Sequence, residues 1–366
     1  MNMMKRSAFG RKSVKGALVL LIAVLVFVLA GCGGSGGSSG GSSGSSGGTS
    51  GGSSGGGSSP SASSGETYTI RISYHVPESH SAHQASEKFK QLVEERSGGR
   101  LEVELYPGGV LGGLRDNTEG VAQGILEMAW TDLGSASIFY PKSGVISLPF
   151  LFRDYDHVEK FFDGEVGQKM KDEVLQASGI RFLAMVHSGF RSIVSTKPIN
   201  SVDDMKNLKL RVPEIPLYTN FAKLLGAAPT PIPSGEIYTS IQTGVVDAAE
   251  LPANTMYDLS LHEVGKYITH TYHIYTDYDL AINDKFYQSL PQDLQQIISD
   301  AAQEVAIETR KLVREQITDY EQKLEASLTK TEVNREDFKN KMGPLYEEFA
   351  QQNDARQLID DILNIQ

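Results

Sequence analysis

The stretch KNLKLRVPEIPLYTNFAKLLGAAPTPIPSGEIYTSIQTGVVDAAELP, residues 206–252, decides the fold of this chain. Its pattern predicts three short strands that alternate with two helices. The strands are expected over 208–212, 230–232 and 245–251, and the helices over 217–225 and 235–243. Glycines end both helices, and Ser234 is the expected N-cap of the second. Strand–helix–strand units of this length predict a parallel sheet with right-handed crossovers.

The carboxyl ends of these strands carry charged residues. Arg211 comes at the end of the first strand, and Glu250 at the end of the third. In open α/β sheets, ligands bind beyond the carboxyl ends of the strands. The stretch therefore predicts an arginine and a carboxylate at the mouth of one crevice.

The N-terminus has the pattern of a bacterial lipoprotein signal. Five Lys and Arg residues precede an apolar segment over 17–29, which is short for a membrane span, and Leu29-Ala30-Gly31-Cys32 follows. We expect residues 1–31 to be a signal peptide and Cys32 to receive the lipid. The alternative is an ordinary secretory signal with a chance cysteine at its end. Cys32 is the only cysteine, so no internal disulfide is possible.

Glycine and serine make up residues 33–65, apart from Thr49, Pro60 and Ala62. Such a composition cannot bury a core, so residues 32–65 are predicted to be a lipidated cysteine followed by a disordered tether. Loss of residues 1–31 removes five of the 34 Lys and Arg and none of the 45 Asp and Glu, which leaves a net charge of −16. A chain this acidic is a poor candidate for binding nucleic acid.

The folded part from Glu66 to Gln366 is long enough for two lobes. Further strands are expected over 68–74, 101–106, 126–131 and 180–186, with extended crossings over 267–281. Helices are expected over 82–97, 118–125, 291–328, 337–350 and 355–363, with two more within 156–178. This order predicts an α/β, two-lobed, periplasmic-binding-protein-like fold, with mixed sheets flanked by helices, hinge strands and a long C-terminal bracing helix. Lobe I is predicted as 66–188 plus 277–316, and lobe II as 189–276 plus 317–366.

Several short motifs, in this order and spacing, resemble one family over about residues 68–294. They are Leu105-Tyr106-Pro107, Phe139-Tyr140-Pro141, Leu148-Pro149-Phe150, Gly189-Phe190-Arg191, Lys197-Pro198-Ile199, Lys209-Leu210-Arg211-Val212-Pro213, Pro229-Thr230-Pro231 and Gly244-Val245-Val246-Asp247. The chain resembles the solute-binding proteins of tripartite ATP-independent periplasmic (TRAP) transporters, of the dicarboxylate-binding, DctP type.

The resemblance implies that Arg211 holds the ligand carboxylate through a two-pronged salt bridge. The planar guanidinium matches the two oxygens of a carboxylate, which agrees with that role. Otherwise Arg211 would be a strand-end arginine paired with a nearby acid. The resemblance places Arg191 near the ligand. Otherwise Arg191 would be an inter-lobe or capping arginine. It also places Asp132 against polar groups of the ligand.

The remaining predicted ligand contacts are Glu250, His75, Trp130 and Tyr275. Trp130 could equally be core, and Tyr275, like Tyr278, could fill the hinge. Where many members of the family have an asparagine able to bind the ligand, this chain has Leu251, and Ser234 replaces a phenylalanine of some sialic-acid binders. Both departures argue against sialic acid.

His75, His80 and His83 could in principle meet around a metal, but no cysteine or clear carboxylate joins them, and a loop with a helix cap is the preferred interpretation. No metal, cofactor or catalytic residue is predicted.

The function implied is a TRAP solute-binding protein that captures a small organic acid (a dicarboxylate, 2-oxo acid or sugar acid) and delivers it to the membrane permease subunits. Its location would be the outer face of the cytoplasmic membrane, lipid-anchored, or the periplasm. The alternatives are a binding protein for an ABC-type permease or a sensor receptor and, more distantly, an extracellular enzyme with paired carboxylates.

Overall fold

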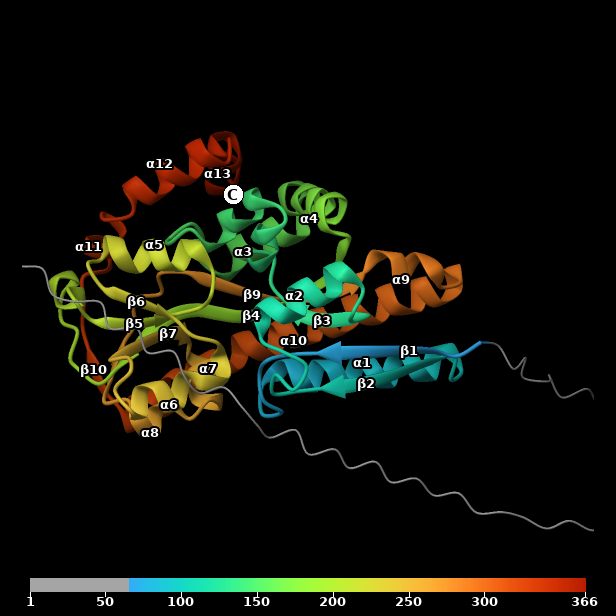
Figure 1. Ribbon diagram of the computed structural model, residues 1–366, viewed down its shortest axis with the longest axis horizontal. Helices are drawn as coiled ribbons and strands as arrows, with labels where there is room; N and C mark the ends of the chain where they lie inside the picture. The colour runs from blue at the N-terminus through green and yellow to red at the C-terminus, as the bar shows by residue number, and fades with distance from the viewer. Residues whose placement is uncertain (1–65) are drawn as a thin grey trace, which may run out of the picture. The chain divides into compact units, whose positions relative to one another are not determined.

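A computed structural model describes residues 66–366. The predicted signal peptide, Cys32 and the tether lie outside these residues. The chain builds two lobes, each around a sheet, and one strand order, β2-β1-β3-β9-β4-β7-β5-β6, runs through both (Figure 1). In the described part of the chain, no helix is long and apolar enough to span a membrane.

The first lobe opens with a parallel sheet, as the sequence predicts. Strand β1 (Tyr68–Ser73) pairs in parallel with β2 (Leu101–Tyr106) and β3 (Met128–Thr131). The alternation of β1 buries Ile70 and Ile72. Helices α1 (Ser81–Ser97) and α2 (Leu114–Gln123) connect these strands, and each ends at a glycine with positive φ.

The stretch over 206–252 forms the second parallel sheet. Strand β5 (Lys209–Val212) pairs in parallel with β6 (Ala228–Pro231) and β7 (Ala248–Pro252). Helices α5 (Pro216–Leu224) and α6 (Ile237–Gln242) are the crossovers. The predicted N-cap at Ser234 is wrong. A 3-10 turn, η4 (Ser234–Glu236), precedes α6, and the N-cap of η4 is Pro233.

One long strand, β4, belongs to both sheets and joins the lobes. Residues 180–190 of β4 (Ile180–Ser195) pair with β9 (Tyr275–Asn283), whereas residues 191–195 pair with β7 and β8 (Tyr267–Thr269). The sequence predicted an end at Val186. Instead the strand continues through an irregularity between His187 and Gly189, where Gly189 has φ +125°. Glycine tolerates that conformation, so the strand changes sheets without breaking.

Helix α10 (Gln292–Ser327) is the predicted long brace, about 54 Å at 1.5 Å per residue. It packs against α1 and β4, and also against α7 (Ala253–Asp258) of the second lobe. Arg310 on α10 donates from Nε to the Met185 carbonyl of β4 at 2.8 Å. The helix therefore contacts both lobes and the strand that joins them.

Smaller elements complete the structure. They are η1 (Ser135–Ile138), η2 (Pro141–Ser147), α3 (Tyr155–Asp163), α4 (Glu165–Ser178), η3 (Val202–Met205), α8 (Leu261–Val264), α9 (Asp284–Ser289), β10 (Thr329–Thr331), α11 (Arg335–Lys339), α12 (Gly343–Gln352) and α13 (Arg356–Leu363). The single helix predicted over 337–350 is two helices, with Gly343 and Pro344 opening the second.

The C-terminal helices do not pack on the second lobe alone. The His157 Nε2 of α3 lies 2.8 Å from the Ile362 carbonyl, and α13 contacts α4. The last residues, assigned above to lobe II, thus return across the molecule to helices of lobe I.

Candidate functional site

A cavity of about 50 Å³ lies between the two lobes. Residues 66–188 and 277–316 contribute His75, His80, Asp132, Ser188 and Tyr278, and residues 189–276 contribute Arg191, Arg211, Tyr218, Ser234, Leu251, Thr255 and Thr276. Leu114, Ile215 and other apolar side chains complete the wall. Four of the seven predicted ligand contacts, namely Arg211, Arg191, Asp132 and His75, therefore meet in one cavity.

Arg211 is buried without a carboxylate partner. Its side chain comes from the end of β5, and Nε donates to the Ile232 carbonyl at 2.7 Å. The residue is 2% exposed, and within residues 66–366 no Asp or Glu lies within ion-pair distance. Burial lowers the pKa of Arg211 to about 9. A guanidinium in this state is stabilised by an anion that enters the cavity.

Arg191 has the opposite surroundings. Its Nη2 donates to Glu250 Oε1 at 2.8 Å, and its Nε donates to Oε2 of the same carboxylate. Nη1 donates to Thr276 Oγ1 at 3.0 Å, and the guanidinium lies over the Tyr218 ring. Burial acts to lower the pKa of Arg191, but the charge of Glu250, its hydrogen bonds to Arg191 and the smaller effects of Tyr218 and Asp132 together outweigh burial, and the pKa is raised. The charge of this arginine is already neutralised inside the protein.

Glu250 does not line the cavity, contrary to the sequence expectation. It is 0% exposed, and besides Arg191 it lies 3.3 Å from His273 Nε2. Burial raises the pKa of Glu250, but Arg191 and His273 more than offset this and the pKa is lowered. The side chain therefore holds Arg191 in place, because β4 and β7 run side by side and bring the two residues together.

Asp132 follows β3 and lines the cavity at 6% exposure. Oδ1 accepts from the Ser135 backbone N–H at 2.6 Å, and Oδ2 accepts from its hydroxyl at 2.9 Å. Burial, together with the nearby Asp277, raises the pKa of Asp132 to about 7.

Two histidines and a tyrosine also line the cavity. His75 Nδ1 lies 3.2 Å from the Tyr278 hydroxyl, and His80 Nδ1 accepts from the Ala82 N–H as the cap of α1. Burial lowers the pKa of His75 to about 3 and that of His80 to about 4. Near neutral pH both rings are uncharged, so they offer hydrogen bonds without adding positive charge.

Trp130 and Tyr275 lie behind the cavity wall. Trp130 stacks on Tyr278 with centroids 5.6 Å apart, and its Nε1 donates to Ser86 Oγ at 2.6 Å. The Tyr275 hydroxyl is 2.6 Å from His187 Nδ1. Successive side chains of a strand point to opposite faces, so Tyr275 and Tyr278, three residues apart on β9, cannot both face the cavity. The alternation of side chains along 275–278 could have been used to exclude one of the two tyrosines from the sequence alone.

Several wall residues were missed. Thr276 faces the cavity because it is two residues from Tyr278 on β9, and Ser188 lies at the β4 irregularity. Tyr218 comes from α5. Their positions depend on how β4 and β9 pair, which the sequence pattern does not reveal.

The three histidines do not assemble around a common point. His75 and His80 make the contacts given above, and His83 Nδ1 lies 2.5 Å from the Tyr74 hydroxyl. Between residues 66 and 366, no group of three or more His, Cys, Asp or Glu is arranged to hold a metal ion.

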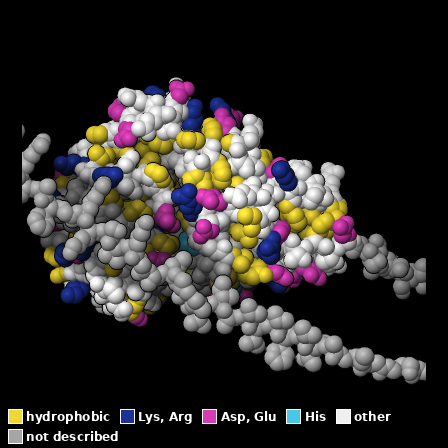
Figure 2. Space-filling view, viewed as in Figure 1, with side chains coloured by type: hydrophobic (Ala, Val, Ile, Leu, Met, Phe, Trp, Pro, Cys, Tyr) yellow, Lys and Arg dark blue, Asp and Glu magenta, His cyan; other side chains and the backbone are white. Residues whose placement is uncertain are grey.

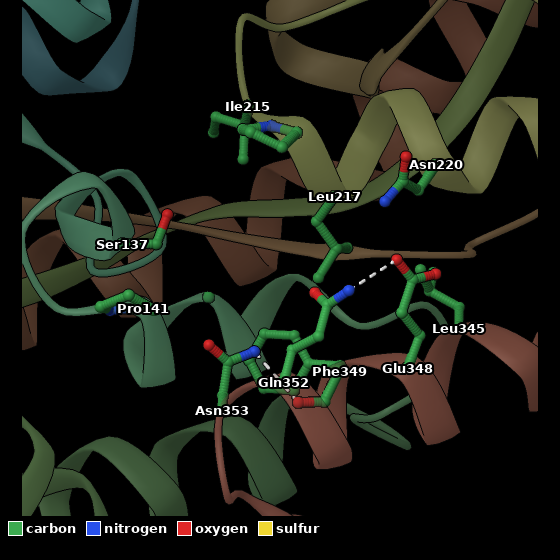
Figure 3. Close-up of a pocket in the computed structure, with 12 residues that line it drawn as sticks. Ser137, Pro141, Ile215, Leu217, Asn220, Leu345, Glu348, Phe349, Gln352 and Asn353 are labelled. Atoms are coloured by element: carbon green, nitrogen blue, oxygen red, sulfur yellow. Dashed lines mark hydrogen bonds between the residues drawn. The ribbon is translucent and has the colours of Figure 1, made fainter.

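A second cavity, of about 180 Å³, lies between α5, α12 and η2 (Figure 3). Leu217, Leu345 and Phe349 form its apolar side, and Glu348 is its charged residue, with Gln352 donating to the carboxylate at 3.1 Å. No Lys, Arg or His lines this groove. A groove with only a negative charge is unsuited to an organic anion. Figure 2 likewise shows Lys and Arg interspersed with Asp and Glu, without a continuous basic patch on this face.

Comparison with known proteins identifies the family. Residues 72–353 match the model of bacterial extracellular solute-binding protein, family 7 (DctP). The sialic acid-binding periplasmic protein SiaP of Vibrio cholerae is 31% identical, over 80% of this chain and 91% of its own length. The 2,3-diketo-L-gulonate-binding periplasmic protein YiaO of Escherichia coli is 33% identical, over 70% of this chain and 78% of its own length.

Solved structures agree with the fold. A TRAP periplasmic solute-binding protein of Roseobacter denitrificans, with bound β-D-glucuronate, has a TM-score of 0.79 at 29% identity and covers 82% of this chain and 100% of its own. One from Polaromonas, bound to D-erythronate, has a TM-score of 0.78 at 29% identity, with 82% and 99% covered. The chain therefore belongs to family 7 of the bacterial extracellular solute-binding proteins, the DctP-type binding proteins of TRAP transporters.

Proposed function

We propose that this protein captures a small hydroxylated monocarboxylate, a sugar acid, and delivers it to a TRAP membrane permease. The observation that carries the proposal is Arg211, a buried guanidinium that faces an inter-lobe cavity and has no Asp or Glu at ion-pair distance among residues 66–366. A ligand carboxylate would accept two parallel hydrogen bonds from it, the geometry that arginine favours.

The charges around the cavity favour one negative charge on the ligand. Arg191 is paired with Glu250, and His75 and His80 are uncharged, which leaves Arg211 as the uncompensated cation of the wall. A second carboxylate on the ligand would gain no further cation from the wall. A monoanion is therefore favoured over a dicarboxylate.

The polar side chains of the wall favour hydroxyl groups. Ser188, Ser234, Thr255 and Thr276 line the cavity and can each donate and accept a hydrogen bond. Relatives with the same fold were solved with β-D-glucuronate and D-erythronate, both polyhydroxy monocarboxylates. Leu251, which is apolar, lies in the wall where the resemblance implies an asparagine in many members.

Binding requires no chemistry on the ligand. The lobes would close around the acid by bending of β4 and β9 near His187 and Gly189, and exclusion of water would strengthen the salt bridge. A lipid on Cys32 would keep the protein at the outer face of the membrane, next to the permease.

A thermal-shift panel on the purified chain tests the binding function. The panel holds uronates, aldonates, 2-oxo acids and dicarboxylates, with Arg211→Ala beside the wild type. Ligand at one hundred times its dissociation constant stabilises a protein by about 2.7 kcal/mol. Stabilisation by sugar acids that is absent in Arg211→Ala is the expected result. Stabilisation by dicarboxylates only, or conversion of a bound acid to a product, would contradict the proposal.

A further inference from the structure

A cluster of three buried carboxyl groups, which anion binding by Arg211 does not require, reaches the cavity at Asp132. Asp132 lines the cavity, and Asp277 and Asp279, both 2% exposed, share one face of β9 behind it. Asp277 accepts a hydrogen bond at 2.9 Å from the backbone N–H of Leu133, the residue that directly follows Asp132 in the chain. Asp279 Oδ2 is buried and has no hydrogen-bond partner among residues 66–366.

Asp277 and Asp279 are two residues apart on β9, so their side chains point to the same face of the strand. Burial raises the pKa of all three carboxyl groups, and the charge of Asp277 adds to the rise at Asp132. The three groups therefore titrate together rather than independently.

The charges that face the cluster differ between Asp132 and Asp279. Arg191 from β4 faces Asp132 but is bonded to Glu250. Lys171 from α4 and Arg310 from α10 face Asp279, and Arg310 donates to both oxygens of Asp163. Two further groups near Asp132 are the phenols of Tyr218 (α5) and Tyr278 (β9), whose pKa values burial raises. Asp132, the member of the cluster that lines the cavity, is therefore the group whose protonation a bound anion would change.

We propose that Asp132 takes up one proton from solvent when an acid anion binds at Arg211, so that the protein carries the anion and the proton together. A second negative charge in a cavity of about 50 Å³ lies close to the Asp132 carboxylate and disfavours its ionised form. The protonated carboxyl can then donate a hydrogen bond to a ligand oxygen. The proton returns to solvent when the acid leaves.

The direction of the pH dependence follows from the raised pKa of Asp132, about 7 without ligand. Binding raises this pKa further. Below pH 7 the proton is already present and affinity is independent of pH. Above pH 7 each binding event takes up a proton, and affinity falls about tenfold per pH unit until the pKa of the complex is reached.

Titration calorimetry of the full chain tests this inference, which rests on the proposed function. D-glucuronate, D-galacturonate and D-erythronate are the probes, each titrated at pH 6 in MES and in bis-Tris, and at pH 8 in HEPES and in Tris. The buffers differ in ionisation enthalpy, so the difference in heat counts the protons taken up. We expect uptake close to one at pH 8 and close to zero at pH 6.

Variants identify the carboxyl group that takes up the proton. Asp132→Asn should bind with no uptake and with affinity that is flat from pH 6 to 8, and Asp277→Asn should reduce the uptake. Asp293→Asn, on the exposed first turn of α10, is the matched control and should behave as wild type. Binding of an acid without uptake at pH 8, or uptake that persists in both Asp132→Asn and Asp277→Asn, overturns this inference alone. Failure of all three acids to bind overturns it together with the proposed function.

Discussion

Two buried arginines meet in one cavity from different regions of the molecule, and their surroundings are opposite. The middle of β4 places Arg191 against Glu250, which holds two of its nitrogens. The end of β5 places Arg211 where, among residues 66–366, only a backbone carbonyl accepts from it. The first arginine is neutralised in the folded chain, whereas the second has no carboxylate at ion-pair distance in the described part of the chain. Burial of an arginine therefore does not by itself identify a ligand contact, and the partners already supplied by the protein decide.

The largest expected effect comes from removing the uncompensated arginine. Arg211→Ala should weaken binding of the sugar acid by about 2–5 kcal/mol, which is thirtyfold or more, because the buried carboxylate would lose its paired donors. The melting temperature without ligand should stay equal or rise, since an uncompensated buried charge is removed. Calorimetry and thermal unfolding measure the two quantities. Unchanged affinity would show that the two arginines have exchanged roles.

Removing the partner of Arg191 should affect mainly the stability of the protein. Glu250→Gln leaves Arg191 buried without its counter-ion, so the free energy of unfolding should fall by about 3–5 kcal/mol. Urea unfolding without ligand measures this. The double variant Arg191→Met, Glu250→Gln should recover part of the loss, and additive losses in the double variant would argue against a coupled pair.

A smaller effect concerns pH. The pKa values of Asp132, Asp277 and Asp279 are raised above those of the unfolded chain, by burial first; Asp277 adds to the rise at Asp132, and Asp279 adds to the rise at Asp277. Their contribution to stability is therefore full below the unfolded pKa of about 4. It is lost as pH rises through the folded pKa values, which are about 7 for Asp132 and about 6 for Asp279. Asp277→Asn should lose less stability between pH 5 and pH 8 than the wild type, by about 1.4 kcal/mol for each pH unit of pKa shift removed.

Urea unfolding of both proteins at pH 5, 6.5 and 8 measures this difference, and parallel curves would contradict it. Glu250, whose pKa is lowered, contributes the opposite slope at acid pH and is common to both proteins. The comparison therefore isolates the carboxyl cluster.

The smallest effect is expected in the groove of Figure 3. Glu348→Gln removes its charge while Ile215, which lines both cavities, stays in place. Affinity for the acid should change less than twofold, because the groove offers no cation to an anion. A tenfold change in calorimetry would show that the two cavities communicate through the start of α5.

The sequence predicted the parts of the site that depend on local pattern. The alternation and glycines of 206–252 specify β5, α5, β6, α6 and β7, and strand ends predicted where Arg211 lies. The pairing of Arg191 with Glu250 depends on β4 lying beside β7, 59 residues apart in the chain, so local pattern could not predict it. Likewise Gly189 looked like a strand end, and only the pairing of both halves of β4 shows that the strand continues. The side of β9 that faces the cavity could have been inferred from alternation, which excludes Tyr275 once Tyr278 is placed.

The pairing of β3 with β9 has a consequence for biosynthesis. Thr131 lies opposite Asp279, so the first sheet lacks its central neighbour until roughly 150 further residues have been made. At about 5–20 residues per second, that interval is about 7–30 seconds of translation. During this time the edge of β3 exposes unpaired backbone groups, a template for wrong pairing. The first sheet therefore gains β9 only after all strands of the second parallel sheet, β5, β6 and β7, have been made.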